Sequence, residues 1–278
     1  MIGGSTRLLG LMGHPVGHSL SPRMHNASFL AEGMDYIYVA MDVSPEDLPA
    51  AVTGASALGF RGFNLTMPHK RAILPLLDSI DEVATVSGAV NTVVIEDKRS
   101  RGYNTDGSGL TEACRESGVD FANRRVLLLG AGGAAAAIAL ALAGEGAKEL
   151  RIVNRSVKHA RELLSKLRKT GKEIKGEAYP FEALDEAASE AEIIVNVTPL
   201  GMTEEDPLPV PVEYLDGREA ICDAVYSPRR ETALVQRARD RGAVVVTGKR
   251  MLLYQGVYAQ RLWTGWEPNV EAMDRALS

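Results

Sequence analysis

The sequence predicts an α/β protein of two domains, and three features of the chain support this prediction. Short apolar runs alternate with helical patterns, which is typical of sheets whose parallel strands are joined by helices. Near residue 106 the pattern changes to a connecting helix, and a second strand–helix series follows. That series begins with a strand running directly into GAGGAAAAIALALAGEG, a glycine-rich turn that enters an alanine-rich helix. We therefore expect one domain at 1–106, completed by C-terminal helices at 249–278, and a second domain at 107–248.

The individual elements follow from the apolar patterns, and the first domain is expected to hold a mostly parallel sheet. Its strands are predicted at Leu8–Leu11, Tyr36–Met41, Gly59–Leu65 and Val90–Ile95, and its helices at Pro22–Gly33, Pro45–Gly54 and Lys70–Leu77. Gly109–Ser117 is predicted as the connecting helix. Later strands are predicted at Arg125–Leu129, Leu150–Val153, Ile193–Val197, Ala220–Ala224 and Ala243–Thr247, with helices at Val157–Arg168 and Met251–Trp263.

Composition and charge exclude several classes of function. Of the 278 residues, 45% are hydrophobic and 24% are charged, which is ordinary for a globular protein. The net charge of −5 argues against nucleic acid as a partner, because a phosphate-binding surface needs a basic excess. The longest apolar run, Ala134–Ala143, is about half the ~20 residues that a membrane-spanning helix needs. We expect no membrane partner.

Cysteine usage points to a reducing compartment. Cys114 and Cys222 are too few for a disulfide framework, and neither belongs to a CxxC metal pattern. We therefore expect no metal site and a cytoplasmic location. The sequence leaves open whether the chain is a monomer or a homodimer.

The glycine-rich turn predicts a dinucleotide site. Gly130, Gly132 and Gly133 follow a strand and open a helix, with Ala135 at the third small position. Such glycines permit a tight turn and let backbone N–H groups approach a pyrophosphate at the helix N-terminus. The alternative is a tight turn leading into a helix packed in the core. The placement after a strand, in a strand–helix–strand unit, favours the dinucleotide site.

The residues after the next strand favour NADP(H) over NAD(H). An NAD enzyme usually carries Asp or Glu there to bind the ribose hydroxyls, whereas this chain has Asn154, Arg155 and Ser156, with Lys158 and His159 following. An acid would repel a 2′-phosphate, while an arginine can bind it bidentately. The alternative is that Asn154 or Ser156 merely caps the next helix.

Two serines near the N-terminus are candidates for binding a carboxylate. The segment GHPVGHSLSP places Ser19 and Ser21 two residues apart between prolines. In an extended chain, alternate residues face the same side, so both hydroxyls could donate to one carboxylate. A serine before a proline is also a common turn or helix N-cap.

Lys70 is the candidate for proton transfer. In the segment NLTMPHK, Pro68 favours the start of a helix and places Lys70 in its first turn. There the helix dipole disfavours the charged amine, which suits proton exchange near neutral pH. The alternative is a solvated surface lysine.

Asp106, in the segment YNTDG at the expected domain junction, is the candidate partner of Lys70. A charge-coupled Lys70–Asp106 pair could take the hydroxyl proton when an alcohol loses hydride. Taken singly, Asp106 could equally be a turn or N-cap residue. The segment GAVNT adds Asn91 as a further polar candidate.

The segments that hold these candidate residues are similar to those of a known family. The chain resembles shikimate dehydrogenases along essentially its whole length. The resemblance rests on nine segments in the family's order: GHPVGHSLSPRMHN, GFNLTMPHK, SGAVNT, YNTDG, GAGGAA, VNRS, NVTPLGM, DAVYSP and GKRMLLYQG. It implies a substrate domain and a Rossmann-type NADP domain with a cleft between them. It also implies reversible NADPH-dependent reduction of 3-dehydroshikimate to shikimate, in the biosynthesis of chorismate and the aromatic amino acids.

The resemblance also implies roles for single residues. Lys70 would be the catalytic acid and base, supported by Asp106. The residues expected to contact the substrate are Ser19, Ser21, Thr66, Lys70, Asn91, Asp106, Tyr226 and Gln255. Those expected to contact the cofactor are Gly130, Ala131, Gly132, Gly133, Ala134, Asn154, Arg155, Ser156, Lys158 and His159, with Ala224, Gly248 and Glu82 at the nicotinamide end.

One position departs from the family pattern. The family usually has Lys or Arg where this chain has His159, which predicts a weaker, more pH-dependent grip on the 2′-phosphate. Two alternatives remain. The first is a quinate/shikimate dehydrogenase that uses NAD, which an acid after the second strand would have favoured. The second is a Rossmann cofactor sensor without catalysis, which would keep GAGGAA but would not need Lys70 or Asp106.

Overall fold

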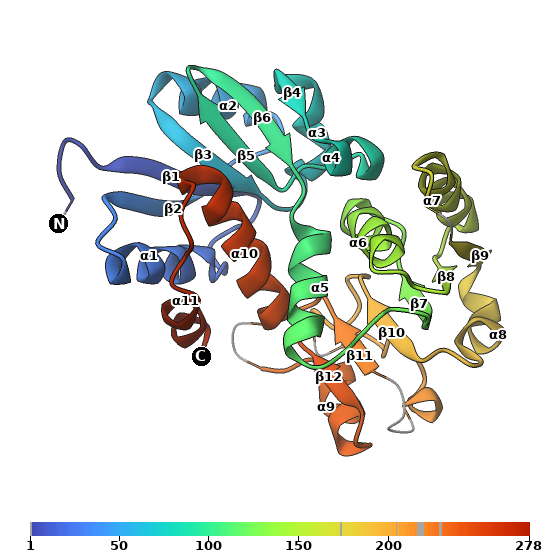
Figure 1. Cartoon of the computed structure of the whole chain (residues 1–278). Helices are drawn as coiled ribbons and strands as arrows, with labels where there is room; N and C mark the ends of the chain where they lie inside the picture. The colour runs from blue at the N-terminus through green and yellow to red at the C-terminus, as the bar shows by residue number, and fades with distance from the viewer. Residues whose placement is uncertain (1, 173, 204, 216–219, 228–229) are drawn as a thin grey trace. The chain divides into compact units, whose positions relative to one another are not determined.

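The computed structural model describes residues 2–172, 174–203, 205–215, 220–227 and 230–278. Its contacts divide the chain into two compact units. Unit 1 comprises Met1–Gly109 and Leu252–Ser278, and unit 2 comprises Leu110–Met251. Two helices, α5 (Asp106–Glu116) and α10 (Gly248–Thr264), each contain residues of both units, so the chain passes between the units inside helices (Figure 1).

Unit 1 is built on a six-stranded sheet in the order β2-β1-β3-β5-β6-β4. The strands are β1 (Arg7–Gly13), β2 (Tyr36–Asp42), β3 (Phe60–Leu65), β4 (Ser79–Ile80), β5 (Thr92–Glu96) and β6 (Arg99–Tyr103). The helices are α1 (Ser21–Ala31), α2 (Leu48–Ala57), α3 (His69–Ala72), α4 (Glu82–Ser87) and α11 (Val270–Leu277). Strand β1 is parallel to β2 and β3, and β4 is parallel to β6, but β5 is antiparallel to β3 and β6.

The β5–β6 hairpin and β4 were not predicted. The turn of the hairpin is made by Asp97 and Lys98, both with positive φ (49° and 62°), so it lacks the glycine that usually signals such a turn. The helix predicted at Lys70–Leu77 is also wrong in length. Helix α3 ends at Ala72 and a 3₁₀ turn follows at Leu74–Leu76, because Pro75 has no N–H to continue an α-helix.

The sheet of unit 1 has a hydrophobic core on each face. On one face, residues of α2 pack with Phe60, Phe63 and Val93. On the other, Phe29 of α1 and Trp263 of α10 pack with Leu9 and Leu11 of β1. The Trp263 indole donates to the carbonyl of Val93 over 2.9 Å, which places α10 on the sheet. Helices α1 and α11 lie side by side (Figure 1).

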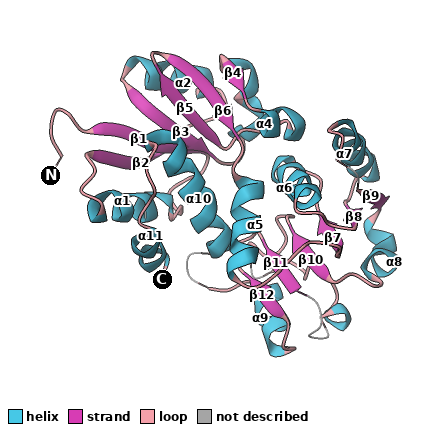
Figure 2. Ribbon diagram, viewed as in Figure 1, coloured by secondary structure: helices cyan, strands magenta, loops and turns pink. Residues whose placement is uncertain are grey.

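Unit 2 contains six parallel strands in the order β12-β11-β10-β7-β8-β9. These strands are β7 (Arg125–Leu129), β8 (Glu149–Val153), β9 (Lys175–Tyr179), β10 (Ile193–Asn196), β11 (Ala220–Asp223) and β12 (Val244–Val246). The main helices are α6 (Gly133–Gly144), α7 (Val157–Lys169), α8 (Leu184–Ala188) and α9 (Ala233–Asp240) (Figure 2). Numbered within the unit, this is the 3-2-1-4-5-6 order of the Rossmann fold.

The Rossmann order fixes where a ligand can bind in unit 2. The chain direction across the sheet reverses between β7 and β10, and ligands of such sheets bind beyond the carboxyl ends of the strands at that point. Helices α8 and α9 cover one face of the sheet through Leu184 and Leu234. Strand β9 and helices α8 and α9 were not predicted.

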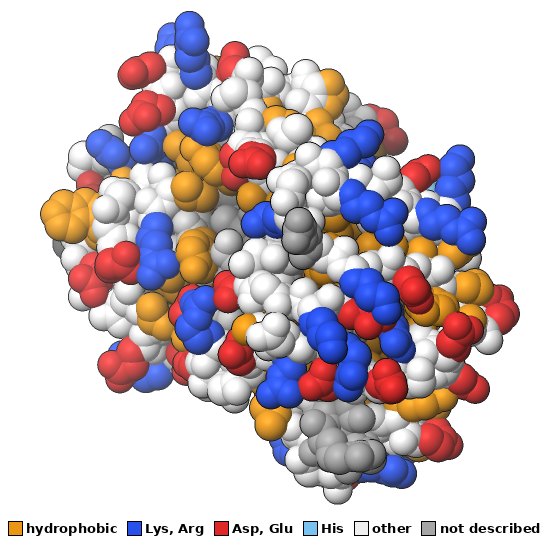
Figure 3. Space-filling model, turned by 45° about the vertical axis from the view of Figure 1, so that its right-hand side comes forward, with side chains coloured by type: hydrophobic (Ala, Val, Ile, Leu, Met, Phe, Trp, Pro, Cys, Tyr) orange, Lys and Arg blue, Asp and Glu red, His pale blue; other side chains and the backbone are white. Residues whose placement is uncertain are grey.

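The surface is mixed in charge. Acidic and basic side chains are interspersed over the face drawn in Figure 3. Within the described ranges, no helix has the length and apolar character needed to span a membrane.

Candidate active site

The missed β5–β6 hairpin assembles the polar site of unit 1. In its register Asn64 of β3 lies opposite Thr92 of β5, and Thr92 lies opposite Tyr103 of β6. Asn91 just before β5 and Asp106 just after β6 are therefore brought together, although they are fifteen positions apart in the chain. The backbone N–H of Val90 donates to the Lys70 carbonyl over 2.8 Å, which draws α3 to the same place.

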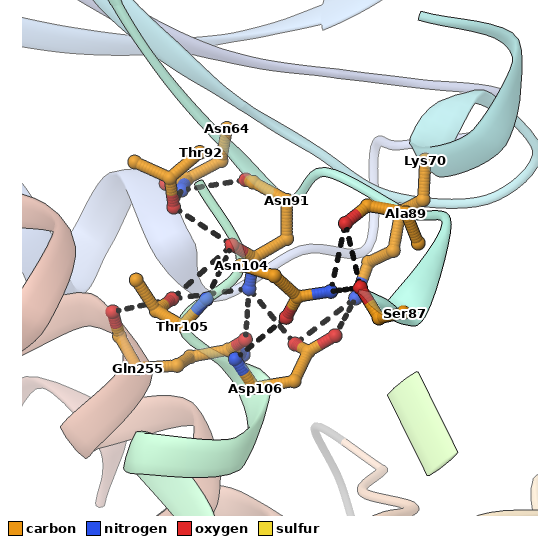
Figure 4. A network of polar contacts seen from close by, with 10 residues as sticks. All are labelled: Asn64, Lys70, Ser87, Ala89, Asn91, Thr92, Asn104, Thr105, Asp106 and Gln255. Carbon is orange, nitrogen blue, oxygen red and sulfur yellow. Dashed lines mark hydrogen bonds and ion pairs between the residues drawn. The ribbon is translucent and has the colours of Figure 1, made fainter. Parts of the chain in front are cut away.

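Lys70 and Asp106 form a close ion pair in this site (Figure 4). The Lys70 Nζ lies 3.0 Å from Oδ1 and 2.8 Å from Oδ2 of Asp106. The Asp106 side chain is 1% exposed, whereas that of Lys70 is 24% exposed. A buried carboxylate without a partner is costly, so the ammonium stabilises Asp106, and the exposed fraction of Lys70 leaves the amine accessible.

Asn91 organises the polar groups around the ion pair. Its Nδ2 lies 2.9 Å from Asp106 Oδ1, 3.0 Å from Thr105 Oγ1 and 3.3 Å from Gln255 Oε1. Its Oδ1 accepts from the Thr105 N–H and the Thr92 hydroxyl, both over 2.9 Å. The two hydrogens of Nδ2 face three acceptors, and Gln255 is the most distant of them. The Gln255 amide is therefore the group most easily turned toward a ligand.

Several residues of this network were not singled out from the sequence, among them Asn64, Thr92, Asn104 and Thr105. Asn64 donates to the Asn91 carbonyl and to Thr92 Oγ1, each over 3.0 Å. Asn104 accepts from the Asp106 N–H over 3.0 Å and donates to the Ala89 carbonyl over 3.0 Å. The only sequence signal is the Asn-Thr pairs that end GAVNT and begin NTDG. Such residues at strand ends look like ordinary turn formers.

The structure corrects the geometry expected of the two serines. Leu20 between them has φ −83° and ψ −10°, which is helical, and it is the N-cap residue of α1. The Ser19 Oγ accepts from the Ser21 N–H over 3.2 Å. The stretch is therefore a turn at a helix start, and the extended conformation predicted for it is wrong. Ser21 is buried and Ser19 half-buried. Thr66 follows β3, next to Gly13 at the end of β1.

In unit 2 the glycine-rich turn lies at the place where a pyrophosphate would bind. Gly130 has φ +110°, and a Cβ there would lie 3.1 Å from the Val197 carbonyl oxygen, so only glycine suits this contact between β7 and β10. A Cβ at Gly132 would meet nothing within 4 Å. The first turn of α6 has no acidic residue, and Ala135 is buried against the sheet. The open N-terminus of α6 fits an anionic group.

The residues expected to bind the 2′-phosphate lie at the end of β8. Arg155, Lys158 and His159 are all exposed. Ser156 occupies the N-cap position of α7, but among the described residues its hydroxyl makes no capping hydrogen bond. Asn154 donates to the Ser156 carbonyl over 2.9 Å. The alternative in which either side chain caps α7 is therefore wrong.

The residues expected at the nicotinamide end belong to both units. Ala224 follows β11, and its N–H donates to the Asn196 carbonyl over 2.8 Å. A Cβ at Gly248 would lie 2.3 Å from the Val225 carbonyl oxygen, so the structure brings Gly248 against this segment. Glu82, in contrast, is an exposed first-turn residue of α4 in unit 1.

These features define a class of protein. A Rossmann sheet with an open glycine-rich helix N-terminus binds a dinucleotide. A lysine paired with a buried carboxylate can exchange a proton with a ligand oxygen. Reduction of a carbonyl to an alcohol needs a hydride donor and a proton donor, and this chain, which offers a site for each, is an oxidoreductase.

Comparison with known proteins places the chain more closely. Three family models match it: "Shikimate dehydrogenase substrate binding domain" over residues 11–93, "Shikimate / quinate 5-dehydrogenase" over 112–200, and "Shikimate 5'-dehydrogenase C-terminal domain" over 248–277. The NADP(+) shikimate dehydrogenase of Rubrobacter xylanophilus is 56% identical over 278 residues, covering 100% of this chain and 97% of that protein. The chain belongs to the shikimate dehydrogenase family.

Solved structures show the same likeness. A shikimate dehydrogenase in complex with NADP+ is 42% identical with a TM-score of 0.90, covering 100% of this chain and 96% of the other. The Thermus thermophilus enzyme, in complex with NADP(H) and shikimate, is 36% identical with a TM-score of 0.87, covering 98% of each chain. A quinate dehydrogenase of Corynebacterium glutamicum, in complex with NAD, is 35% identical with a TM-score of 0.88, covering 98% of each chain.

Proposed function

We propose that this chain catalyses the reversible reduction of 3-dehydroshikimate to shikimate with NADPH. The observation that carries the proposal is the Lys70–Asp106 pair, with its distances of 2.8 and 3.0 Å and its buried carboxylate. The relative from Rubrobacter xylanophilus bears the name of this activity. A dinucleotide-binding protein without catalysis would not need such a pair.

The cofactor site of unit 2 suits NADP(H). The open N-terminus of α6 and its preceding glycines would hold the pyrophosphate. Arg155, exposed at the end of β8, would bind the 2′-phosphate, with Lys158 and His159 nearby on α7. No acid occupies the positions of Asn154, Arg155 and Ser156, so nothing there repels the phosphate. When bound, NADPH supplies the hydride that reduces the carbonyl carbon.

Lys70 supplies the proton of the same reaction. As the carbonyl oxygen of the substrate gains negative charge, the Lys70 ammonium donates a proton to it, and an alcohol results. In the reverse direction the neutral amine takes the hydroxyl proton. Asp106 holds the ammonium at 2.8 Å and stabilises its charge, and Asn91 donates to the same carboxylate over 2.9 Å, which fixes the orientation of Asp106.

The remaining polar groups of unit 1 are proposed to orient the substrate. Ser19 and Ser21 would donate to its carboxylate, as hydroxyls at the start of α1. Thr66, Asn91 and Gln255 would bind the ring hydroxyls, each presenting a polar group close to the Lys70–Asp106 pair or to the end of β3. From unit 2, Tyr226 would add a substrate contact, and Ala224 and Gly248 would contact the nicotinamide.

The test is steady-state turnover with a matrix of two substrates and two cofactors. We expect kcat/KM to be highest for shikimate with NADP, measured by the near-ultraviolet absorbance of NADPH. A higher kcat/KM for quinate with NAD would favour the quinate/shikimate alternative, in line with the similarity to the enzyme of Corynebacterium glutamicum. NADPH binding without turnover of either substrate would favour the cofactor sensor.

We also propose that the protein works in the cytoplasm, as a monomer or a homodimer. Cys114 and Cys222 are buried free thiols whose sulfur atoms lie 3.4 Å apart, and thiols stay reduced in that compartment. Light scattering of the purified protein would give the oligomeric state, and a mass above that of a dimer would contradict the proposal.

A further inference from the structure

Unit 2 buries a carboxylate that the proposed mechanism does not use. Asp223, the last residue of β11, is 1% exposed. Its Oδ1 accepts from the Val225 N–H over 3.1 Å and from Asn196 Nδ2 over 2.9 Å. Its Oδ2 accepts from the Thr232 hydroxyl over 2.5 Å. Among the described residues, the hydrogen bonds to this carboxylate come from three neutral donors.

These contacts tie together the segments at the carboxyl ends of two neighbouring strands. Asn196 is the last residue of β10, and its Oδ1 accepts from the N–H and the hydroxyl of Thr198 in the following loop. Thr232 is the N-cap of α9, where its hydroxyl accepts from the Val235 N–H. Asp223 is the one group that contacts both Asn196 and Thr232 among the hydrogen bonds described for these residues.

The same segment is fixed from its other side by Gly248. A Cβ at Gly248 would lie 2.3 Å from the Val225 carbonyl oxygen and 2.9 Å from that of Ala224. Both polar groups of Val225 are thus constrained, since Asp223 holds its N–H and Gly248 lies against its C=O. Tyr226 follows Val225 directly. Asp223 and Gly248 therefore set the backbone path of Ala224–Tyr226, and neither needs a side-chain contact with a ligand to do so.

We propose that Asp223 is a positioning residue, whose carboxylate fixes the Ala224–Tyr226 segment for the nicotinamide and the substrate. The inference rests on the proposed function, in which Ala224 contacts the nicotinamide and Tyr226 contacts the substrate. Among the described residues only neutral donors bind this carboxylate, so its burial is offset incompletely, and the role inferred for it needs its acceptor oxygens in place and not its charge. Burial accordingly raises the pKa of Asp223 above its ordinary value.

The test compares three variants of Asp223 with one control. Asp223→Ala removes the acceptor, and Asp223→Glu keeps the charge but displaces it by one methylene. Asp223→Asn keeps one acceptor oxygen for Val225 and Asn196, and its NH₂ can donate to Thr232. Glu149→Gln is the matched control, because Glu149 is a buried carboxylate at the opposite end of the same sheet, held by Arg151. Kinetic constants are normalised to the NADPH-binding sites of each preparation.

We expect Asp223→Ala and Asp223→Glu to lower kcat roughly 10- to 100-fold and to raise KM for shikimate, as small misplacements of reacting groups do. Asp223→Asn should stay within about threefold of the wild type. The Kd of NADPH should change less than about threefold in all of them, about 0.7 kcal/mol, because the phosphate-binding residues lie on other loops. The fluorescence enhancement of bound NADPH, which reports on the nicotinamide surroundings, should fall by about half or more in the Ala and Glu variants.

A purely structural role gives a different result. Asp223→Ala and Asp223→Glu would then behave like Glu149→Gln, with a lower Tm but with kcat, KM and NADPH fluorescence of the wild type, and the inference would be overturned. If Asp223→Ala does not fold, the comparison of Asp223→Asn with Asp223→Glu decides the question. A higher kcat for Asp223→Asn supports the inference, and equal kinetic constants for the two variants overturn it. A wild type that does not turn over shikimate refutes the proposed function instead.

Discussion

At the scale of single residues, the proposed function depends on an ion pair whose carboxylate is buried. The Asp106 carboxylate is buried and the Lys70 amine is partly open to solvent, so each group needs the other. Asn91 binds the same carboxylate and so links the pair to Thr105 and Gln255. The sequence predicts Lys70 and Asp106 as a pair, but each residue taken singly has an ordinary alternative, because a first-turn lysine and a turn aspartate are common. The register of the hairpin makes them a pair.

The first prediction concerns Lys70. Replacing it in Lys70→Ala should lower kcat at least ~100-fold, the usual scale for losing a general acid or base, and leave KM for shikimate within a few-fold. Steady-state kinetics measure this. Arg71→Ala is the control, since Arg71 is an exposed cation of the same short helix. A Lys70→Ala enzyme that retains more than half of the wild-type kcat would refute the assignment.

The second prediction concerns cofactor choice. Arg155→Ala should remove most of the preference for NADP over NAD, because Arg155 stands where NAD enzymes keep an acid. The ratio of kcat/KM for the two cofactors measures it, with Arg161→Ala, an exposed arginine of α7, as the control. An unchanged ratio in Arg155→Ala would show that the 2′-phosphate binds elsewhere. In a separate NADP titration at about pH 8, His159→Lys should bind NADP more tightly than the wild type, because a lysine carries a full positive charge there.

At the scale of elements, the site follows from where strands and helices end. Periodicity predicted most strands of both sheets, because apolar alternation and apolar runs carry that signal. It missed the β5–β6 hairpin, whose turn residues Asp97 and Lys98 give no turn signal. Asn64 and Asn104 could not be recognised for the same reason, since Thr92, the partner of Asn64, lies on that hairpin and Ala89, the partner of Asn104, lies just before it. The glycine-rich turn was predictable because the residues that form it lie next to one another in the chain.

The third prediction concerns the N-terminus of α6. Gly132→Asp should leave the Tm of the ligand-free protein unchanged or raise it, because Gly132 is an N-cap in the β region (φ −80°, ψ −171°) and a carboxylate there complements the helix dipole. The same carboxylate should repel the pyrophosphate and weaken NADPH binding at least ~10-fold, about 1.4 kcal/mol.

Fluorescence titration and thermal unfolding of one preparation measure these two effects together. Gly132→Ser is the control, because it offers a cap without a charge and should lose much less affinity. NADPH binding to Gly132→Asp as tight as to the wild type would place the pyrophosphate away from α6.

At the scale of the whole molecule, helix α10 completes unit 1 through buried polar contacts. Gln260 of α10 donates from Nε2 to the Nδ1 of His25 in α1 over 3.0 Å and accepts from the Ser28 hydroxyl over 2.9 Å. His25 stacks on Tyr38 with ring centroids 4.4 Å apart. Burial lowers the pKa of His25 from 6.5 to about 3, so the folded protein holds it neutral.

The fourth prediction concerns the pH dependence of stability. Below pH 6.5 the unfolded chain protonates His25 and the folded chain does not, which favours the unfolded chain. The stability that comes from burying a neutral His25 is therefore fully present above pH 6.5 and is lost as the pH falls toward about 3. The loss approaches about 1.4 kcal/mol per pH unit. Urea unfolding of the wild type and His25→Asn at several pH values between roughly 7.5 and 5 measures it. A difference between the two proteins that does not depend on pH would contradict the buried neutral histidine.

We propose that this chain transfers hydride from NADPH to the carbonyl carbon of 3-dehydroshikimate while Lys70 protonates the oxygen. The most direct measurement mixes the enzyme with 3-dehydroshikimate and NADPH that carries deuterium in its transferable position. We predict one shikimate formed for each NADPH consumed, with deuterium on the carbon that bore the carbonyl. NADPH that is not consumed, or that is consumed without forming labelled shikimate, would contradict this account.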